Sequence, residues 1–284
     1  MSRWSLPRVR PSRVSLALYR LKGFKPCHAN ATRLQPRYMY IAFPRPTPIP
    51  FDESMTSPIV RARREQIESA LRPLADAQQA VPMRAYMLNQ FEFLGIRATP
   101  RRQALRGLSR LNPWTAAELL ELADLLWEMP EREFQYVAVD VLSKHHRQLG
   151  PDSVPQLLQL VQRKSWWDTV DGLAGVVGDI LLRASSDQPD TQRAMDACIR
   201  HPNPWVRRVA MLHQLGWRAQ TDEVRLLRYA LALAGETEFF TRKAIGWALR
   251  DHARTRPEAV RAFLVQHAQS LSGLTRREAG KHLG

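Results

Sequence analysis

Three stretches of this sequence combine aromatic rings with charges in a way that a simple hydrophobic core would not. They run from Lys164 to Asp171, from Asn203 to Ala210 and from Phe239 to Arg250. In the first stretch, Trp167 and Asp171 stand four residues apart and therefore share one face of a helix. A carboxylate can stabilise positive charge that develops in a reaction, and the face of an indole ring attracts the same charge. These stretches are the candidates for chemistry.

Several residues in these stretches also have an ordinary structural interpretation. Trp166 and Trp205 are expected to fill the core, as tryptophan on a packed helix usually does. Taken alone, Asp171 would be a solvated acid, and Arg207 and Arg208 would be an exposed charge pair. The sequence has no His-x-Asp or His-Glu-x-x-His spacing and no glycine-rich phosphate loop, which argues against an iron-dependent dealkylase, a zinc hydrolase and a nucleotide hydrolase. No metal and no cofactor are predicted.

The elements that must position these residues are predicted to be helices. From Pro58 onward, apolar residues recur with helical spacing, and no stretch reads as a convincing strand. Thr115 and Glu118 before a leucine-rich run predict a capping box, and Gly150 and Gly235 stand where helices should end. The predicted helices are 58–77, 82–94, 99–112, 115–129, 131–148, 153–163, 166–185, 189–200, 204–217, 221–234, 238–254, 257–269 and 274–283.

A small residue recurs at a nearly constant interval inside these helices. Ala138, Ala174, Ala210 and Ala244 are 36, 36 and 34 residues apart, each among larger apolar neighbours. Small residues at such a period are what stacked pairs of helices need for close packing. The sequence therefore favours an α-solenoid over a compact bundle, and in a solenoid the three candidate stretches meet on one concave wall.

The first 54 residues differ from the rest. They hold 10 Lys and Arg against 2 Asp and Glu, and 8 of the 20 prolines, so they carry +8 of the net charge of +15. We predict a disordered basic extension at 1–54 and one folded domain at 55–284, because so polar a segment buries too little apolar surface to fold. The extension has three interpretations: a DNA-binding tail, an organelle transit peptide, or sequence upstream of a true start at Met55. The last is favoured because a helix follows directly.

The overall charge and the cysteine content indicate which partners and which cellular compartment to expect. A net charge of +15 attracts polyanions, with nucleic acid as the first candidate and an anionic membrane surface as the second. Cys27 and Cys198 are too few for a disulfide framework, which indicates a reducing compartment. No apolar run is long enough to span a bilayer. We expect a cytoplasmic monomer, with organelle targeting by residues 1–54 as the alternative.

Together these motifs resemble those of the DNA alkylation repair proteins, which are glycosylases built from HEAT-like helical repeats. The resemblance extends over nearly all of 82–283. It is most specific in Lys-Ser-Trp-Trp-Asp-x-Val-Asp from Lys164 and in Lys-Ala-Ile-Gly-Trp-x-Leu-Arg from Lys243, which occur in the same order. It implies an all-α solenoid of HEAT-like repeats with a concave, basic cleft that binds DNA.

The resemblance also implies roles for single residues. Asp171 corresponds to the catalytic carboxylate, Trp167 and Trp247 to the aromatic pair that lines the lesion site, and Arg208 to the arginine that holds DNA close to the scissile sugar. The residues implied to bind DNA are Tyr86, Arg97, Arg102, Lys243 and Arg250. The family usually has glutamine where Arg97 aligns, so the contact made there is expected to differ.

The function implied is excision of cationic alkylated purines, 3-alkyladenine and 7-alkylguanine, from duplex DNA by a monofunctional DNA N-glycosylase in base excision repair. No lysine is placed convincingly for Schiff-base chemistry. Two other functions remain open: a noncatalytic HEAT-repeat binder of damaged or branched DNA, and a protein-binding solenoid with a basic face. The enzyme interpretation requires that Asp171, Trp167 and Trp247 lie close together and reach solvent.

Overall fold

The computed structural model describes residues 57–107, 114–184 and 189–283, and its regular elements there are helices apart from one isolated bridge between Glu92 and Glu131. The all-α prediction is therefore confirmed. The predicted extension at 1–54 lies outside the described residues. The α-helices are α2 (Pro58–Leu71), α3 (Ala77–Tyr86), α4 (Ala98–Ala104), α5 (Ala116–Glu128), α6 (Arg132–Lys144), α7 (Val154–Gln162), α8 (Trp167–Ala184), α9 (Arg193–Cys198), α10 (Pro204–Leu212), α11 (Glu223–Ala232), α12 (Phe239–His252), α13 (Pro257–Gln266) and α14 (Gly273–Ala279).

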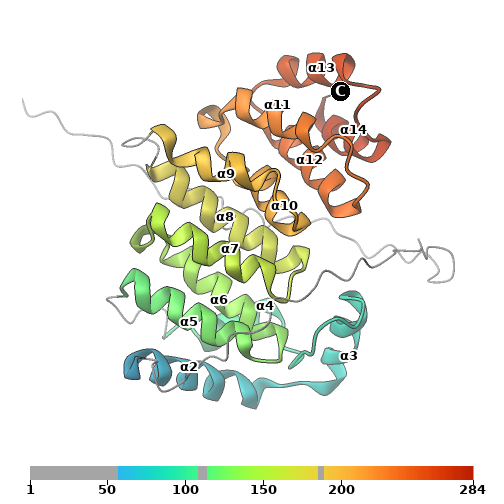
Figure 1. The fold of residues 1–284 in the computed structure, drawn as a ribbon. Helices are drawn as coiled ribbons and strands as arrows, with labels where there is room; N and C mark the ends of the chain where they lie inside the picture. The colour runs from blue at the N-terminus through green and yellow to red at the C-terminus, as the bar shows by residue number, and fades with distance from the viewer. Residues whose placement is uncertain (1–56, 108–113, 185–188, 284) are drawn as a thin grey trace, which may run out of the picture.

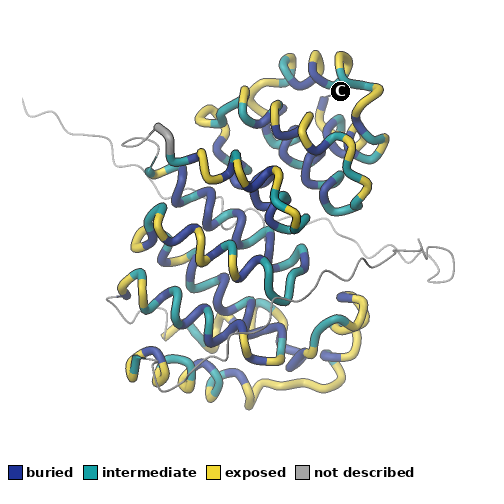
Figure 2. Tube along the Cα trace, in the orientation of Figure 1, coloured by how far each residue is buried: buried dark blue, intermediate teal, exposed yellow. Residues whose placement is uncertain are grey.

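The helices are arranged as an α-solenoid, as the sequence predicts. Helices α6, α8, α10, α12 and α14 form one row in which each packs against the next, and we call this the stacked row (Figure 1). The helices that alternate with them along the chain, α5, α7, α9, α11 and α13, each pack against a member of the row. Buried residues recur along these helices where they face one another (Figure 2), and the largest apolar cluster continues from Val60 to Leu283.

The alanine period falls on the stacked row. Ala138, Ala174, Ala210 and Ala244 lie on α6, α8, α10 and α12, and each is at most 1% exposed. Glycines add to the close approach: a Cβ built on Gly172 of α8 would lie 2.5 Å from a methyl group of Val139 on α6. The helices of the row pack this tightly because small residues stand at the contacts.

Gly178 of α8 lies close to the backbone at the end of α10, and we expect its replacement by Ala to destabilise the fold. The added Cβ would lie 2.0 Å from the carbonyl oxygen of His213, a backbone atom that cannot rotate away. We expect the free energy of unfolding to fall by about 1–3 kcal/mol, because the two helices must separate. Urea unfolding measures this. Gly150→Ala is the control, since its Cβ would meet nothing within 4 Å; equal losses in both variants would contradict the packing argument.

One predicted helix is wrong. The sequence predicts a helix at 82–94, whereas α3 spans Ala77–Tyr86 and contains Pro82, and the chain from 87 to 97 is not helical. Asp76 caps α3 at its start by accepting from the backbone N–H groups of Gln78 and Gln79. The later part is held in an irregular, non-helical conformation by Glu133, whose buried carboxylate accepts from the backbone N–H groups of 94, 95 and 96 at 2.9–3.0 Å. A tertiary contact thus overrides local helical periodicity.

Other helix starts follow the local signals. The Thr115 capping box is present: Thr115 Oγ1 accepts from the backbone N–H of Glu118, and the Glu118 carboxylate accepts from the backbone N–H of Thr115 at 2.7 Å. The predicted helix at 131–148 is α6 followed by a short 3-10 turn, His146–Gln148. In the described part of the chain, no helix is both long enough and apolar enough to cross a membrane.

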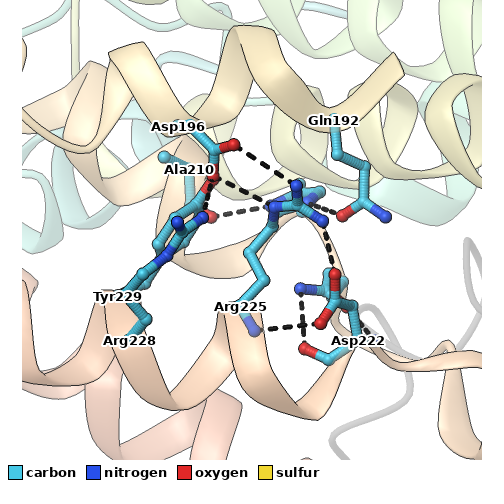
Figure 3. Close-up of polar contacts among 9 residues, drawn as sticks. Gln192, Asp196, Ala210, Asp222, Arg225, Arg228 and Tyr229 are labelled. Atoms are coloured by element: carbon cyan, nitrogen blue, oxygen red, sulfur yellow. Dashed lines mark hydrogen bonds and ion pairs between the residues drawn. The ribbon is translucent and has the colours of Figure 1, made fainter. Parts of the chain in front are cut away.

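A polar cluster ties α9 to α11, on either side of α10 (Figure 3). Asp196 of α9 accepts hydrogen bonds from the Tyr229 hydroxyl at 2.6 Å and from Arg225 at 3.0 Å, and it also pairs with Arg228. Burial by itself would raise the pKa of Asp196, but the hydrogen bonds from Arg225 and Tyr229 bring that pKa below its usual value. The cluster therefore stabilises the packing around α10, the helix that carries Arg208.

Candidate functional site

The first two turns of α8 carry two acids, and each is held by a buried arginine from a neighbouring helix of the stacked row. Asp171 is paired with Arg208 of α10: Nε lies 2.6 Å from one carboxylate oxygen and Nη2 lies 2.8 Å from the other. The Arg208 side chain is 2% exposed and that of Asp171 is 12% exposed. Arg208 also donates to the backbone carbonyl of Phe240 on α12. One guanidinium therefore joins α8, α10 and α12 at the candidate site.

Asp168 makes the second pair, with Arg132 of α6. Two nitrogens of the Arg132 guanidinium lie 3.0 and 2.6 Å from the two carboxylate oxygens, and the Tyr136 hydroxyl donates to Asp168 at 2.7 Å. Burial, and then the negative charge of Asp168, raise the pKa of Tyr136 above its usual range. Arg132 also donates to the Lys164 carbonyl at 2.8 Å, so it fixes the start of α8 directly. Asp168 is thus a structural acid.

One indole ring lies against the Asp171–Arg208 pair, and a second stands one turn earlier on α8. The Arg208 guanidinium carbon lies 5.4 Å from the centre of the Trp247 ring, on α12. Trp167 precedes Asp171 by one helical turn and makes an edge-to-face contact with Tyr86, with ring centres 6.2 Å apart. Both tryptophans are partly exposed, and Tyr86 is 61% exposed. The structure therefore places Asp171, Arg208 and Trp247 together, with Trp167 and Tyr86 continuing along the same surface.

Trp247 is positioned by an acid that the sequence motifs did not single out. Glu278 of α14 accepts from the Trp247 indole N–H at 3.2 Å and pairs with Arg250 at 3.1 Å. Burial would raise the pKa of Glu278, but the hydrogen bond from Lys281 leaves that pKa below its usual value. The resemblance covers both Trp247 and Glu278. Because the two residues are 31 positions apart, the sequence did not show that they are in contact.

The arginines predicted to bind DNA at Arg97 and Arg102 have different partners from each other and from the Asp171–Arg208 pair. Arg97 is exposed and donates to the Gln79 side chain at 2.8 Å. The exposed Arg102 is paired with Asp140 at 2.9 Å and borders a cavity of about 250 Å³ between α2, α4, α5 and α6. The residues that line this cavity do not include Asp171, Arg208, Trp167 or Trp247.

Lys243 lies over two aromatic rings, with its ammonium nitrogen 5.1 Å from the centre of the Trp247 ring and 5.4 Å from that of Phe239. Burial lowers the pKa of Lys243, and Glu278 only partly offsets this. Lys243 therefore stands beside Trp247, on the same face of α12. Arg250, one turn further along the helix, is occupied by its contact with Glu278.

An aromatic cluster lies next to these residues. Trp166 is 9% exposed and packs against Phe240 at 4.9 Å and Trp205 at 5.7 Å between ring centres. The prediction that Trp166 is a core residue is confirmed, and Trp205 packs with it while remaining partly exposed. The cluster packs against α8, α10 and α12 near the positions of Asp171, Arg208 and Trp247.

The fold and the site define a class: an α-solenoid that presents an acid, an arginine and two indole rings on adjacent helices of one row. The family model described as DNA alkylation repair enzyme matches residues 67–283. A solved structure described as a predicted DNA alkylation repair enzyme from Enterococcus faecalis is 30% identical, with a TM-score of 0.69, and the match covers 74% of this chain and 97% of that one. No match was found among curated proteins. This chain belongs to the DNA alkylation repair enzyme family.

Proposed function

We propose that this protein is a DNA glycosylase that excises cationic alkylated purines, such as 3-alkyladenine and 7-alkylguanine, from duplex DNA. The observation that carries this proposal is that Asp171 pairs with Arg208, which lies against the Trp247 ring, while Trp167 stands one turn earlier on the same helix. Membership of a DNA alkylation repair family supports it. The enzyme interpretation requires that these three residues reach solvent, and each of them is partly exposed.

The proposed chemistry needs few groups. A purine alkylated at N3 or N7 is already cationic, so it leaves with the electron pair of the glycosidic bond and needs no general acid. The sugar becomes an oxocarbenium ion, which the Asp171 carboxylate stabilises, and a water molecule then adds to C1′ and gives up a proton. The indole faces attract the cationic base by about 0.5–2 kcal/mol each. Hydrolysis of this single bond corresponds to a monofunctional glycosylase.

Arg208 receives a more specific role here than the family resemblance implied. Its guanidinium is buried, and its nitrogens donate to Asp171 and to the Phe240 carbonyl rather than to solvent. We propose that Arg208 orients the Asp171 carboxylate. A carboxylate has about four lone-pair positions, so Asp171 can accept both hydrogen bonds from Arg208 and still face the sugar.

The proposed partner is duplex DNA that contains alkylated bases, and the protein is proposed to act as a monomer. The net charge of +15 favours a polyanion, and the proposed DNA contacts are made in a basic cleft by Tyr86, Arg97, Arg102, Lys243 and Arg250. Such contacts release counterions, so the association constant should fall log-linearly with salt concentration. Affinity for duplex DNA that does not change with salt would contradict this part of the proposal.

The experiment that tests the function is an assay of free base. Methylated duplex DNA is incubated with the protein, and the bases released are identified by mass. We expect 3-methyladenine or 7-methylguanine to accumulate over repeated turnovers, and no unmodified base. Release no faster than from DNA alone would contradict glycosylase activity.

A noncatalytic binder of damaged or branched DNA is the second candidate, and one observation favours it. Both carboxylate oxygens of Asp171 accept hydrogen bonds from a buried arginine, as they would in a purely structural pair. A binder would retain affinity for DNA with an alkylated or branched site but release no base. A time course of base release, measured under conditions where DNA is bound, separates the two functions.

Trp247→Ala should reduce kcat/KM for base release by about 10-fold, which is the loss of one cation–π contact of 0.5–2 kcal/mol. Trp247→Phe is the matched control, because a phenyl ring keeps an aromatic face but loses the hydrogen bond to Glu278. We expect Trp247→Phe to retain most of the activity. If the two variants lose equally, the indole acts through Glu278 rather than through its face.

A further inference from the structure

The proposed reaction does not use the cavity between α2, α4, α5 and α6. The volume of this cavity is about 250 Å³, whereas an apolar cavity of about 150 Å³ is already large enough to bind benzene. The four helices, together with residues next to their ends, supply its lining. The cavity therefore has room for a small organic molecule whose body is about the size of one aromatic ring.

The buried residues of the lining are mostly apolar. Ile67, Leu122 and Val137 are at most 3% exposed, and the Trp114 ring is 9% exposed. His145 lies next to Trp114, with ring centres 6.1 Å apart, and burial lowers the pKa of His145, so its imidazole is neutral at pH 7. Such a wall favours an apolar group over water. We call these five residues the apolar wall.

The exposed residues of the lining are all cationic, namely Arg102, Arg106 and Lys144. Arg63 is a fourth, partly exposed cation, and its guanidinium carbon lies 5.4 Å from the centre of the Trp114 ring. Asp140 is the one acid among the described lining residues, and it accepts from Arg102 at 2.9 Å. Four cations against one acid give the lining a net charge of +3. The mouth of the cavity therefore favours an anionic group.

We propose that this cavity binds a small amphipathic organic anion, whose apolar body lies against the apolar wall and whose anionic group meets the cations at the mouth. Pockets for small molecules commonly combine a mostly apolar lining with a few polar or charged groups that fix the orientation of the ligand. The proposal goes beyond the proposed function and does not depend on base release. Arg102 is also a proposed DNA contact, so it is left unchanged in the test.

The test uses 4-(trifluoromethyl)benzoate as the probe and follows its binding to the full-length protein by fluorine NMR. We expect a Kd of about 1 mM or below, as suits a ligand of this size. The neutral 4-(trifluoromethyl)benzamide has the same body but no charge, and it should bind at least about 10-fold more weakly. No binding of the benzoate up to about 10 mM, or equal affinities for the two probes, would overturn the proposal.

Two variants locate the binding. Val141→Phe adds volume at a partly exposed residue of the lining and should weaken binding of both probes at least about 10-fold. The double variant Arg63→Gln with Lys144→Gln removes two of the four cations. It should weaken binding of the benzoate about 10-fold and change that of the benzamide little. Arg254→Gln is the matched control, because it removes an arginine that is 57% exposed and is not among the lining residues.

Thermal unfolding of each variant separates loss of the site from loss of the fold. The double variant changes residues at the mouth, so its Tm should stay within about 2 °C of wild type. This variant decides the outcome if Val141→Phe does not fold. Benzoate affinity that the double variant leaves unchanged, or that Arg254→Gln lowers equally, contradicts the site. Because DNA takes no part in these measurements, their outcome is independent of whether the protein releases bases.

Discussion

Asp171→Asn is expected to reduce the rate of base release from methylated duplex DNA by about 10²–10³-fold, the usual effect of removing one group that stabilises charge in a transition state. Asparagine is nearly isosteric with aspartate and can still accept a hydrogen bond from Arg208, but it has no negative charge to oppose the oxocarbenium ion. Because the buried Arg208 loses its counter-charge, stability should also fall, so release is compared well below the Tm, where the DNA affinity should change little while kcat falls. Single-turnover release of methylated base, with DNA binding measured in parallel, checks this.

Asp168→Asn is the matched control for that experiment. Asp168 lies on the same helix, one turn away, and is also held by a buried arginine, but it faces Arg132 and Tyr136 rather than Trp247. At a temperature well below the Tm, we expect this variant to release base at nearly the wild-type rate despite lower stability. Full release by Asp171→Asn, or equal losses in the two variants, would exclude Asp171 as the catalytic acid.

Arg132→Ala is expected to have the largest effect on stability, with a loss of about 3–5 kcal/mol in the free energy of unfolding and a fall of about 10 °C in Tm. The Arg132 side chain is 0% exposed and bonds Asp168, Thr169 and the Lys164 carbonyl. Its removal leaves the Asp168 carboxylate, only 6% exposed, without a compensating charge. Urea and thermal unfolding measure the loss.

Two variants make the Arg132 result specific. Arg254→Ala removes an arginine whose side chain is 57% exposed, so it should change the free energy of unfolding by less than about 0.5 kcal/mol. The double variant Arg132→Ala with Asp168→Ala should be less destabilised than the sum of the two single variants, because no uncompensated carboxylate remains. Strict additivity would show that the pair contributes little and that lost packing against Phe91 dominates.

The Arg132–Asp168 pair matters for the proposed function because it lies at the start of α8, next to the candidate site. Arg132 fixes the start of α8, which carries Trp167 and Asp171, and it also contacts Phe91 in the segment that follows α3. One buried side chain thus positions α8 relative to the 87–97 segment. The Asp171–Arg208 pair does the same between α8 and α10. The candidate site is held together by long-range polar contacts as much as by apolar packing.

The sequence alone predicts the features that depend on local spacing. The capping box at Thr115, the alanine period on α6, α8, α10 and α12, and the shared face of Trp167 and Asp171 all follow from intervals of three, four or about 36 residues. The all-α solenoid follows from the same regularity. These features were accessible because a helix, and a stack of similar helices, repeats its contacts at a fixed period.

The tertiary structure decides the features that depend on distant partners. Apolar spacing predicts a helix over 82–94, but α3 ends at Tyr86, and the Glu133 carboxylate binds the backbone N–H groups of 94–96 and holds them in a non-helical conformation. The resemblance singles out Asp171, but local spacing does not show the partners of Asp168 and Asp171. Only the packing of the helices gives them Arg132 and Arg208, 36 and 37 residues away. The physical reason is that helical periodicity specifies which face of a helix a residue occupies, whereas the group opposite that face is set by how the helices pack.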